Sequence, residues 1–121
     1  MVGLKKTLVA LLFSGASAGA FAECEEVGYI ATFDVKSGSE GAFEQAITTV
    51  AAKVLEVEPG TLFYAPYRGQ ESRYYMMERY TNEAARQAHA KSPEVLALFP
   101  AVMATLAEPI TVEAVSAVCA L

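Results

Sequence analysis

The spacing of hydrophobic and polar residues changes along the chain, and each type of spacing predicts a strand or a helix. Residues 28–35 are mostly β-branched and aromatic, which is typical of a half-buried strand. Ser37 and Glu40 then fit a capping box, and Pro59-Gly60 supplies a stop signal, so a helix is predicted between them. One apolar face of this helix follows from residues that recur at steps of three and four: Phe43, Ile47, Val50, Val54 and Val57.

Two further strands are predicted at Thr61–Tyr67 and Arg73–Thr81, joined by a hairpin-length loop at residues 68–72. Pro66 cannot donate a hydrogen bond to a neighbouring strand, so the first of these strands should lie at a sheet edge or carry a bulge. Alternation along the second strand places Tyr74, Met76, Glu78 and Tyr80 on one face and Tyr75, Met77 and Arg79 on the other.

The last third of the chain predicts short helices followed by one strand. Asn82 is a candidate N-cap for a helix that runs to about Ala90, and Ser92 with Pro93 starts a second one. Pro100 predicts a kink or an early end in this second helix. Residues 110–118 form the last strand.

The order of elements is therefore β-α-β-β-α-β, the ferredoxin-like arrangement of an α+β domain. In this arrangement the first and last strands are antiparallel neighbours. The helices cover one face of the sheet, and a single domain of residues 23–121 has nothing left to cover the other. We expect a homodimer that hides this second face.

The first residues predict a secretory signal peptide over residues 1–22. Lys5 and Lys6 precede an apolar run, and Ala20-Phe21-Ala22 forms a cleavage site. The run is shorter than the roughly 20 residues that a membrane-spanning helix needs. We expect export to the periplasm or the medium and no membrane attachment after cleavage; the alternative is a retained anchor.

Charge excludes one class of partner. Removing Lys5 and Lys6 leaves seven basic against fourteen acidic side chains, so the mature domain is acidic. Such a domain repels phosphate backbones, and nucleic-acid binding is not expected.

The two cysteines, Cys24 and Cys119, flank the predicted domain at its opposite ends. Export places them in an oxidising compartment, and antiparallel first and last strands bring their positions together. We expect a Cys24–Cys119 disulfide; two separate thiols are the alternative. Two cysteines and one histidine provide no zinc-ligand spacing.

One string of motifs resembles a known family. Glu58-Pro59-Gly60, an aromatic strand at residues 63–67, Glu78 with Tyr80, Ala88-His89 and Ser92-Pro93 follow the order seen in antibiotic biosynthesis monooxygenase (ABM) domains, which include quinol monooxygenases. The resemblance spans about residues 28–118. It implies a dimeric α/β barrel and an oxygenation by O₂ that uses no flavin, haem or metal cofactor.

Such a reaction needs a substrate that itself donates electrons to oxygen, as an ionised phenol or quinol does. A protein assists by binding a small aromatic substrate in an apolar pocket and removing its proton. His89 matches the Ala-His position of the family and is the candidate catalytic base, because histidine changes charge near neutral pH. The alternative is a partly buried histidine that only bonds to its surroundings.

Four further residues are candidates for substrate binding. Tyr64 and Tyr80 belong to the aromatic set of the two central strands, although aromatics in that pattern also form cores and interfaces. Glu78 matches a family position; its alternatives are a general base and a structural ion pair across the dimer with Arg68, Arg73 or Arg79. Arg68 lies at the hairpin and could attract an anion or remain a solvated cation.

Three other functions compete with oxygenation of an aromatic. A haem-degrading branch of the superfamily uses a tryptophan and a histidine ligand, whereas this chain has no tryptophan and carries Phe99 near the ligand position. A second alternative is a non-catalytic exported dimer that binds a small aromatic or hydrophobic compound. A third is a purely structural dimer, since one fold hosts many functions.

Overall fold

The computed structural model describes residues 25–119, which form one antiparallel sheet and four helices. The sheet has the order β2 (Thr61–Arg68), β3 (Arg73–Tyr80), β1 (Val27–Asp34), β4 (Thr111–Ser116), and each strand is antiparallel to its neighbours. This order confirms the expected α+β ferredoxin-like fold. In chain order the elements are β1 (Val27–Asp34), α2 (Glu40–Val57), β2 (Thr61–Arg68), β3 (Arg73–Tyr80), α3 (Glu83–Ala90), α4 (Pro93–Leu96), α5 (Phe99–Met103) and β4 (Thr111–Ser116).

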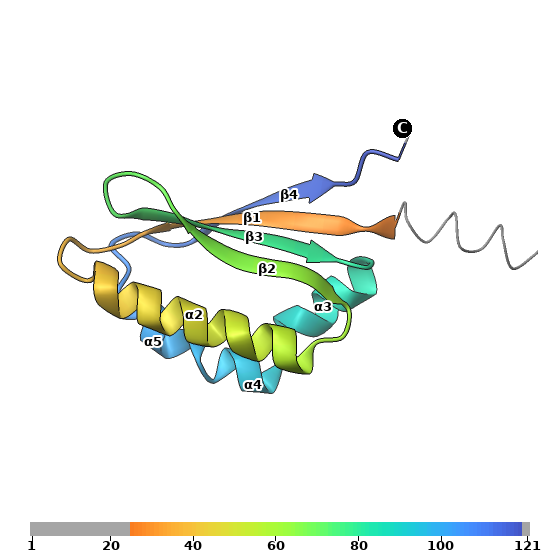
Figure 1. The fold of residues 1–121 in the computed structure, drawn as a ribbon, viewed down its shortest axis with the longest axis horizontal. Helices are drawn as coiled ribbons and strands as arrows, with labels where there is room; N and C mark the ends of the chain where they lie inside the picture. The colour runs from red at the N-terminus through yellow and green to blue at the C-terminus, as the bar shows by residue number, and fades with distance from the viewer. Residues whose placement is uncertain (1–24, 120–121) are drawn as a thin grey trace, which may run out of the picture.

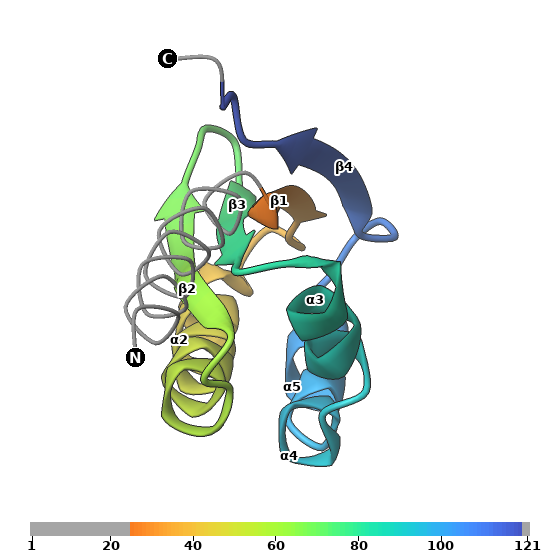
Figure 2. The same cartoon turned by 90° about the vertical axis from the view of Figure 1, so that its right-hand side faces the viewer.

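All described helices lie on one face of the sheet (Figure 1). Seen from the end, α2 forms one column beneath the sheet and α3, α4 and α5 form a second column beside it (Figure 2). The core fills the space between sheet and helices, and its largest fully buried side chains include Phe43, Ile47, Met76 and Tyr80.

The apolar stripe of α2 is confirmed, but its predicted cap is wrong. Phe43, Ile47, Val50 and Val54 are buried against the sheet. The helix starts at Glu40 with Ser39, not Ser37, as its N-cap, and Ser39 makes no side-chain capping bond. The reason is a turn over residues 36–39 that places Gly38 at φ +90°, after which the Glu40 carboxylate accepts the Gly38 N–H instead.

β2 is an edge strand, as Pro66 predicted, and a register shift lies between Thr61 and Phe63. In the hairpin after it, Glu71 and Ser72 both have positive φ values, 52° and 62°. Positive φ at both central residues is the feature of a primed turn, whose twist matches that of the flanking strands.

The alternation predicted for β3 is confirmed. Tyr74, Met76 and Tyr80 are buried beneath the sheet, and Glu78 on the same face is half-buried. The other face carries exposed or half-exposed apolar side chains, among them Met77 and Val115, each about two-fifths exposed. No helix of residues 25–119 covers this face (Figure 1).

The predictions for the last third hold where the structure tests them. The Asn82 side chain accepts the Ala85 N–H at 2.9 Å and caps α3. Pro93 opens α4, and the helix breaks before Pro100, which sits in the first turn of α5. Proline tolerates this position because the first-turn N–H groups have no partner within a helix.

Two expectations fall on residues outside the described range. The predicted signal peptide over residues 1–22 lies there, as does Cys24, one half of the predicted disulfide. Cys119 is described and follows β4 at an exposed position. Among residues 25–119, no helix is long and apolar enough to cross a bilayer.

Candidate functional site

His89 lies near the end of α3, and α3 docks closely onto the turn between α2 and β2. Gly60 in that turn approaches Ala85 so closely that a Cβ at residue 60 would lie 2.6 Å from the Ala85 Cβ. A further backbone bond runs from the Thr81 N–H to the Gly60 carbonyl at 2.9 Å. The glycine therefore lets the helix that carries His89 sit against the turn that carries Glu58.

The His89 ring bonds to Glu58 in this turn. Nδ1 lies 2.9 Å from both Oε1 and Oε2 of the Glu58 carboxylate. The Thr61 hydroxyl donates a second hydrogen bond to Oε1 at 2.8 Å. Both partners are largely buried, with 14% of the His89 side chain and 10% of the Glu58 side chain exposed. This burial limits screening by water and favours a defined geometry.

Tyr64 and Tyr80 both pack against the His89 ring, with centroid distances of 5.2 and 5.4 Å. Both tyrosines are buried, and burial raises the pKa of each phenol well above its ordinary value, with nearby Glu78 acting in the same direction. The two phenols therefore stay protonated at physiological pH. Neither tyrosine lines the pocket described below, so both contact the His89 ring without taking part in that pocket.

Glu78 faces the same region from β3. Its Oε2 accepts a hydrogen bond from the Tyr80 hydroxyl at 2.9 Å. Burial is the main cause that raises the pKa of this carboxyl, and the Tyr80 bond and the His89 charge oppose the rise. A carboxyl of this kind holds its proton to higher pH than a solvated one.

Among residues 25–119 of one chain, Glu78 forms no ion pair with Arg68, Arg73 or Arg79, and a pair across a dimer stays a prediction. Arg73 and Arg79 point to the opposite face because side chains alternate along β3. Arg68 lies at the other end of β2, opposite Tyr74. Each arginine has another partner: Arg73 pairs with Asp34, Arg79 with Glu26 and Arg68 with Glu44.

A pocket of about 270 Å³ opens between the sheet and α3–α5. His89 and Glu78 bring titratable groups to it, and Arg86, one helical turn before His89, adds a positive charge. The Arg86 guanidinium lies 5.1 Å from the centroid of the Tyr29 ring, and Glu83 holds it by an ion pair. The remaining lining is mainly apolar: Tyr29, Ala90, Val95, Leu96, Phe99 and Val112.

Arg68 lies outside this pocket. Its guanidinium donates to Glu44 at 2.6 Å, and the Tyr74 hydroxyl donates to the same carboxylate at 2.7 Å. These residues line a separate hollow near the hairpin end of the sheet. The structure thus brings together His89, Glu78, Tyr64 and Tyr80 but not Arg68.

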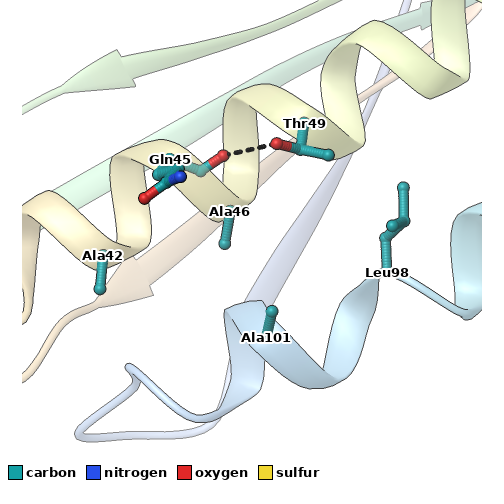
Figure 3. Close-up of a pocket in the computed structure, with 6 residues that line it drawn as sticks. All are labelled: Ala42, Gln45, Ala46, Thr49, Leu98 and Ala101. Atoms are coloured by element: carbon teal, nitrogen blue, oxygen red, sulfur yellow. Dashed lines mark hydrogen bonds between the residues drawn. The ribbon is translucent and has the colours of Figure 1, made fainter.

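A larger hollow of about 340 Å³ lies between α2 and the α4–α5 segment. Figure 3 shows Ala42 and Ala46 of α2 on one wall and Ala101 and Leu98 on the opposite wall. Its polar side chains are Gln45 and Thr49, and the Thr49 hydroxyl bonds to the Gln45 carbonyl at 2.8 Å. No titratable side chain lines this hollow, so it provides no group for acid–base chemistry.

Comparison with protein families gives one match. The model of the antibiotic biosynthesis monooxygenase (ABM) family matches residues 27–101, more than half of the chain. The chain belongs to the ABM family. The matched range includes every residue of the His89 pocket except Val112.

Solved structures share the ABM fold of this chain. A proposed antibiotic biosynthesis monooxygenase from Caulobacter crescentus CB15 is 30% identical, with a TM-score of 0.75 over 79% of this chain and 92% of that one. SnoaB, a cofactor-independent oxygenase from Streptomyces nogalater, is 21% identical, with a TM-score of 0.67 over 77% and 93% of the two chains. Rv0793 from Mycobacterium tuberculosis is 22% identical, with a TM-score of 0.69 over 77% and 95%. No curated protein sequence matches the chain.

Sequence reasoning missed most residues around His89, among them Glu58, Arg86 and Tyr29. Glu58 was noted only as part of the Glu-Pro-Gly string, and its contact with His89 spans 31 positions of sequence. Arg86 had a usable signal, because residues three apart share one face of a helix. Tyr29 carried no signal beyond its place in a predicted strand.

Proposed function

We propose that this protein is a cofactor-independent monooxygenase that oxidises a small electron-rich aromatic compound, a quinol or phenol, with O₂. The observation that carries the proposal is the position of His89 in an apolar pocket with its Nδ1 bonded to Glu58. Membership of a family that includes the cofactor-independent oxygenase SnoaB supports the same class of reaction. We propose that it acts after export, in the periplasm or the medium.

For a hydroquinone the reaction balances with no other reductant. One oxygen atom of O₂ is inserted into a ring C–H bond as a hydroxyl group. The second oxygen leaves as water with two hydrogens of the substrate, and the quinol becomes a hydroxyquinone. The four electrons that reduce O₂ all come from the substrate. Because the ionised quinol is the better electron donor, removing its proton is the step that a protein can assist.

His89 is suited to this step. Since Nδ1 is bonded to Glu58, Nε2 is the ring nitrogen left to accept a proton from a substrate hydroxyl. The positive charge of Arg86 favours the resulting anion, and the apolar walls around it strengthen that attraction by excluding water. Glu78, whose pKa burial raises, is placed in the same pocket to hold or donate a proton.

We also propose that the chain acts as a homodimer through the uncovered face of its sheet. Met77 and Val115 lie on this face. Three residues of β2 lie on the same face, because each is opposite a β3 residue of that face: Phe63 is opposite Arg79, Ala65 opposite Met77 and Tyr67 opposite Tyr75. An apolar surface that spans several strands is typical of an interface. A dimer mass by light scattering that falls to the monomer mass in Met77→Arg is the expected result; a monomeric parent protein would contradict it.

The test of the oxygenase is oxygen uptake by the purified protein, treated with chelator, on a panel of hydroquinones and naphthoquinols. Uptake above autoxidation is expected, with a loss of about 10²-fold or more in His89→Ala, the range that a general base contributes. Glu94→Gln, an exposed acidic residue of α4, is the control and should retain the parent rate.

Two other outcomes would contradict the proposal. Saturable binding of the same quinols without uptake would favour a non-catalytic binding protein, and His89→Ala would then leave affinity nearly unchanged. Neither binding nor uptake would favour a structural dimer.

A further inference from the structure

The Glu58 carboxylate reaches His89 from outside the substrate pocket. It bonds to the ring but does not line the pocket, whereas His89 does. Its own position is set by the turn between α2 and β2, where Oε1 accepts the Thr61 hydroxyl. Glu58 can therefore act on a bound substrate only through the imidazole.

The bonding pattern decides which ring nitrogen carries the proton. An ionised carboxylate accepts hydrogen bonds and cannot donate them. Oε1 and Oε2 both lie 2.9 Å from Nδ1, so Nδ1 is the donor. In the neutral ring the lone pair must then be on Nε2, for which the described residues provide no hydrogen bond.

We propose that Glu58 is a positioning residue that fixes His89 in the Nδ1–H tautomer and directs Nε2 toward the substrate hydroxyl. The role rests on the proposed oxygenase function. When Nε2 takes the substrate proton the ring becomes positive, and the negative carboxylate at 2.9 Å stabilises that charge. No atom of Glu58 contacts the substrate.

The rest of the Glu-Pro-Gly string serves the same contact. α2 ends at Val57 with Glu58 as its C-cap, and Pro59, which cannot continue a helix, comes directly after Glu58. Gly60 lacks the Cβ that would collide with Ala85, so α3 can approach. Thr61 then holds the carboxylate. The four consecutive residues 58–61 thus fix the position of the His89 ring on α3.

The tautomer can be measured without substrate, because His89 is the only histidine of the chain. In ¹⁵N-histidine spectra of the whole protein with the imidazole neutral, Nδ1 should be protonated and Nε2 unprotonated. In Glu58→Ala the ratio of Nδ1–H to Nε2–H should fall by about tenfold or more, as expected for loss of a buried partner. Glu56→Ala, an exposed carboxylate two residues earlier, is the control and should leave the ratio unchanged.

A second variant protects the test against a failure of Glu58→Ala to fold. Glu58→Gln keeps the shape but offers both a donor and an acceptor to Nδ1, so a mixture of tautomers is expected. Both variants should also lower kcat/KM for quinol oxidation by at least about tenfold, a loss that Glu56→Ala should not show.

The outcomes separate the two proposals. A tautomer ratio that stays unchanged in Glu58→Ala and Glu58→Gln overturns the positioning role, whether or not the parent protein consumes oxygen. A shifted ratio with a parent protein that consumes no oxygen supports the control of His89 by Glu58 and overturns only the oxygenase. A shifted ratio together with reduced turnover supports both.

Discussion

Gly60 and Ala85 lie in such close contact that the site depends on the missing side chain of the glycine. A Cβ at residue 60 would be 2.6 Å from the Ala85 Cβ, a distance that requires something to move. The Gly60 carbonyl ties the α2–β2 turn to Thr81, the residue directly after β3, so α3 is the element expected to shift. Any shift of α3 carries His89 away from Glu58.

Gly60→Ala is therefore expected to destabilise the protein by about 1–3 kcal/mol through overpacking, measured by urea unfolding. The control is Gly41→Ala in the first turn of α2, where an added Cβ meets nothing within 4 Å. That change should be neutral or stabilise by up to about 0.5–1 kcal/mol, because alanine favours a helix. Adding Ala85→Gly to Gly60→Ala should recover part of the loss; no recovery would show that the contact is not the cause.

The raised pKa of Glu78 predicts that the stability of the protein depends on pH. Burial raises the pKa of this carboxyl above its ordinary value of 4.5, so the folded protein binds the proton more tightly than the unfolded chain does. Stability is then lost as pH rises from the ordinary value through the raised one. Glu78→Gln removes this loss and keeps an acceptor for the Tyr80 hydroxyl.

The expected result is a higher melting temperature for Glu78→Gln than for the parent protein at pH 8, and no difference near pH 4. Thermal unfolding followed by circular dichroism at both pH values tests it. A variant that melts below the parent protein at pH 8 would mean that the ionised carboxylate stabilises the fold.

The hairpin turn stores backbone strain at Glu71, which has a φ of 52°. Asparagine adopts this region more readily than glutamate, so Glu71→Asn should stabilise the protein by about 0.5–1 kcal/mol in urea unfolding. Gln70→Asn is the matched control, because Gln70 has no positive φ, and should give no gain. Ser72 is kept in both variants, since its hydroxyl bonds to Glu40.

The Cys24–Cys119 disulfide stays a prediction, because Cys24 lies outside the described residues. Val27 pairs with Ser116, and each cysteine lies three residues beyond its member of that pair. We expect protein isolated from an oxidising compartment to react with iodoacetamide only after reduction. Cys119→Ser should lower the free energy of unfolding by about 2–4 kcal/mol under oxidising conditions and leave that of the reduced protein unchanged. Thiol labelling without reduction would contradict the bridge.

The sequence determined the elements and their order, because the signals for them are local. The stripe of α2, the alternation of β3, the Asn82 cap and the proline positions each act within a few residues, and the structure bears them out. The first helix cap was misplaced by two residues, since Ser37 and Ser39 carry equivalent local signals and only the turn at Gly38 separates them.

The tertiary structure alone decided which of the candidate residues meet. His89 and Glu58 are 31 residues apart, and their contact depends on how closely α3 docks at Gly60. Pairing of β2 with β3 placed Tyr64 opposite Glu78 and sent Arg68 to the far end with Tyr74. Periodicity can say which face a side chain is on, but strand register and the distance between packed elements set which side chains on that face touch.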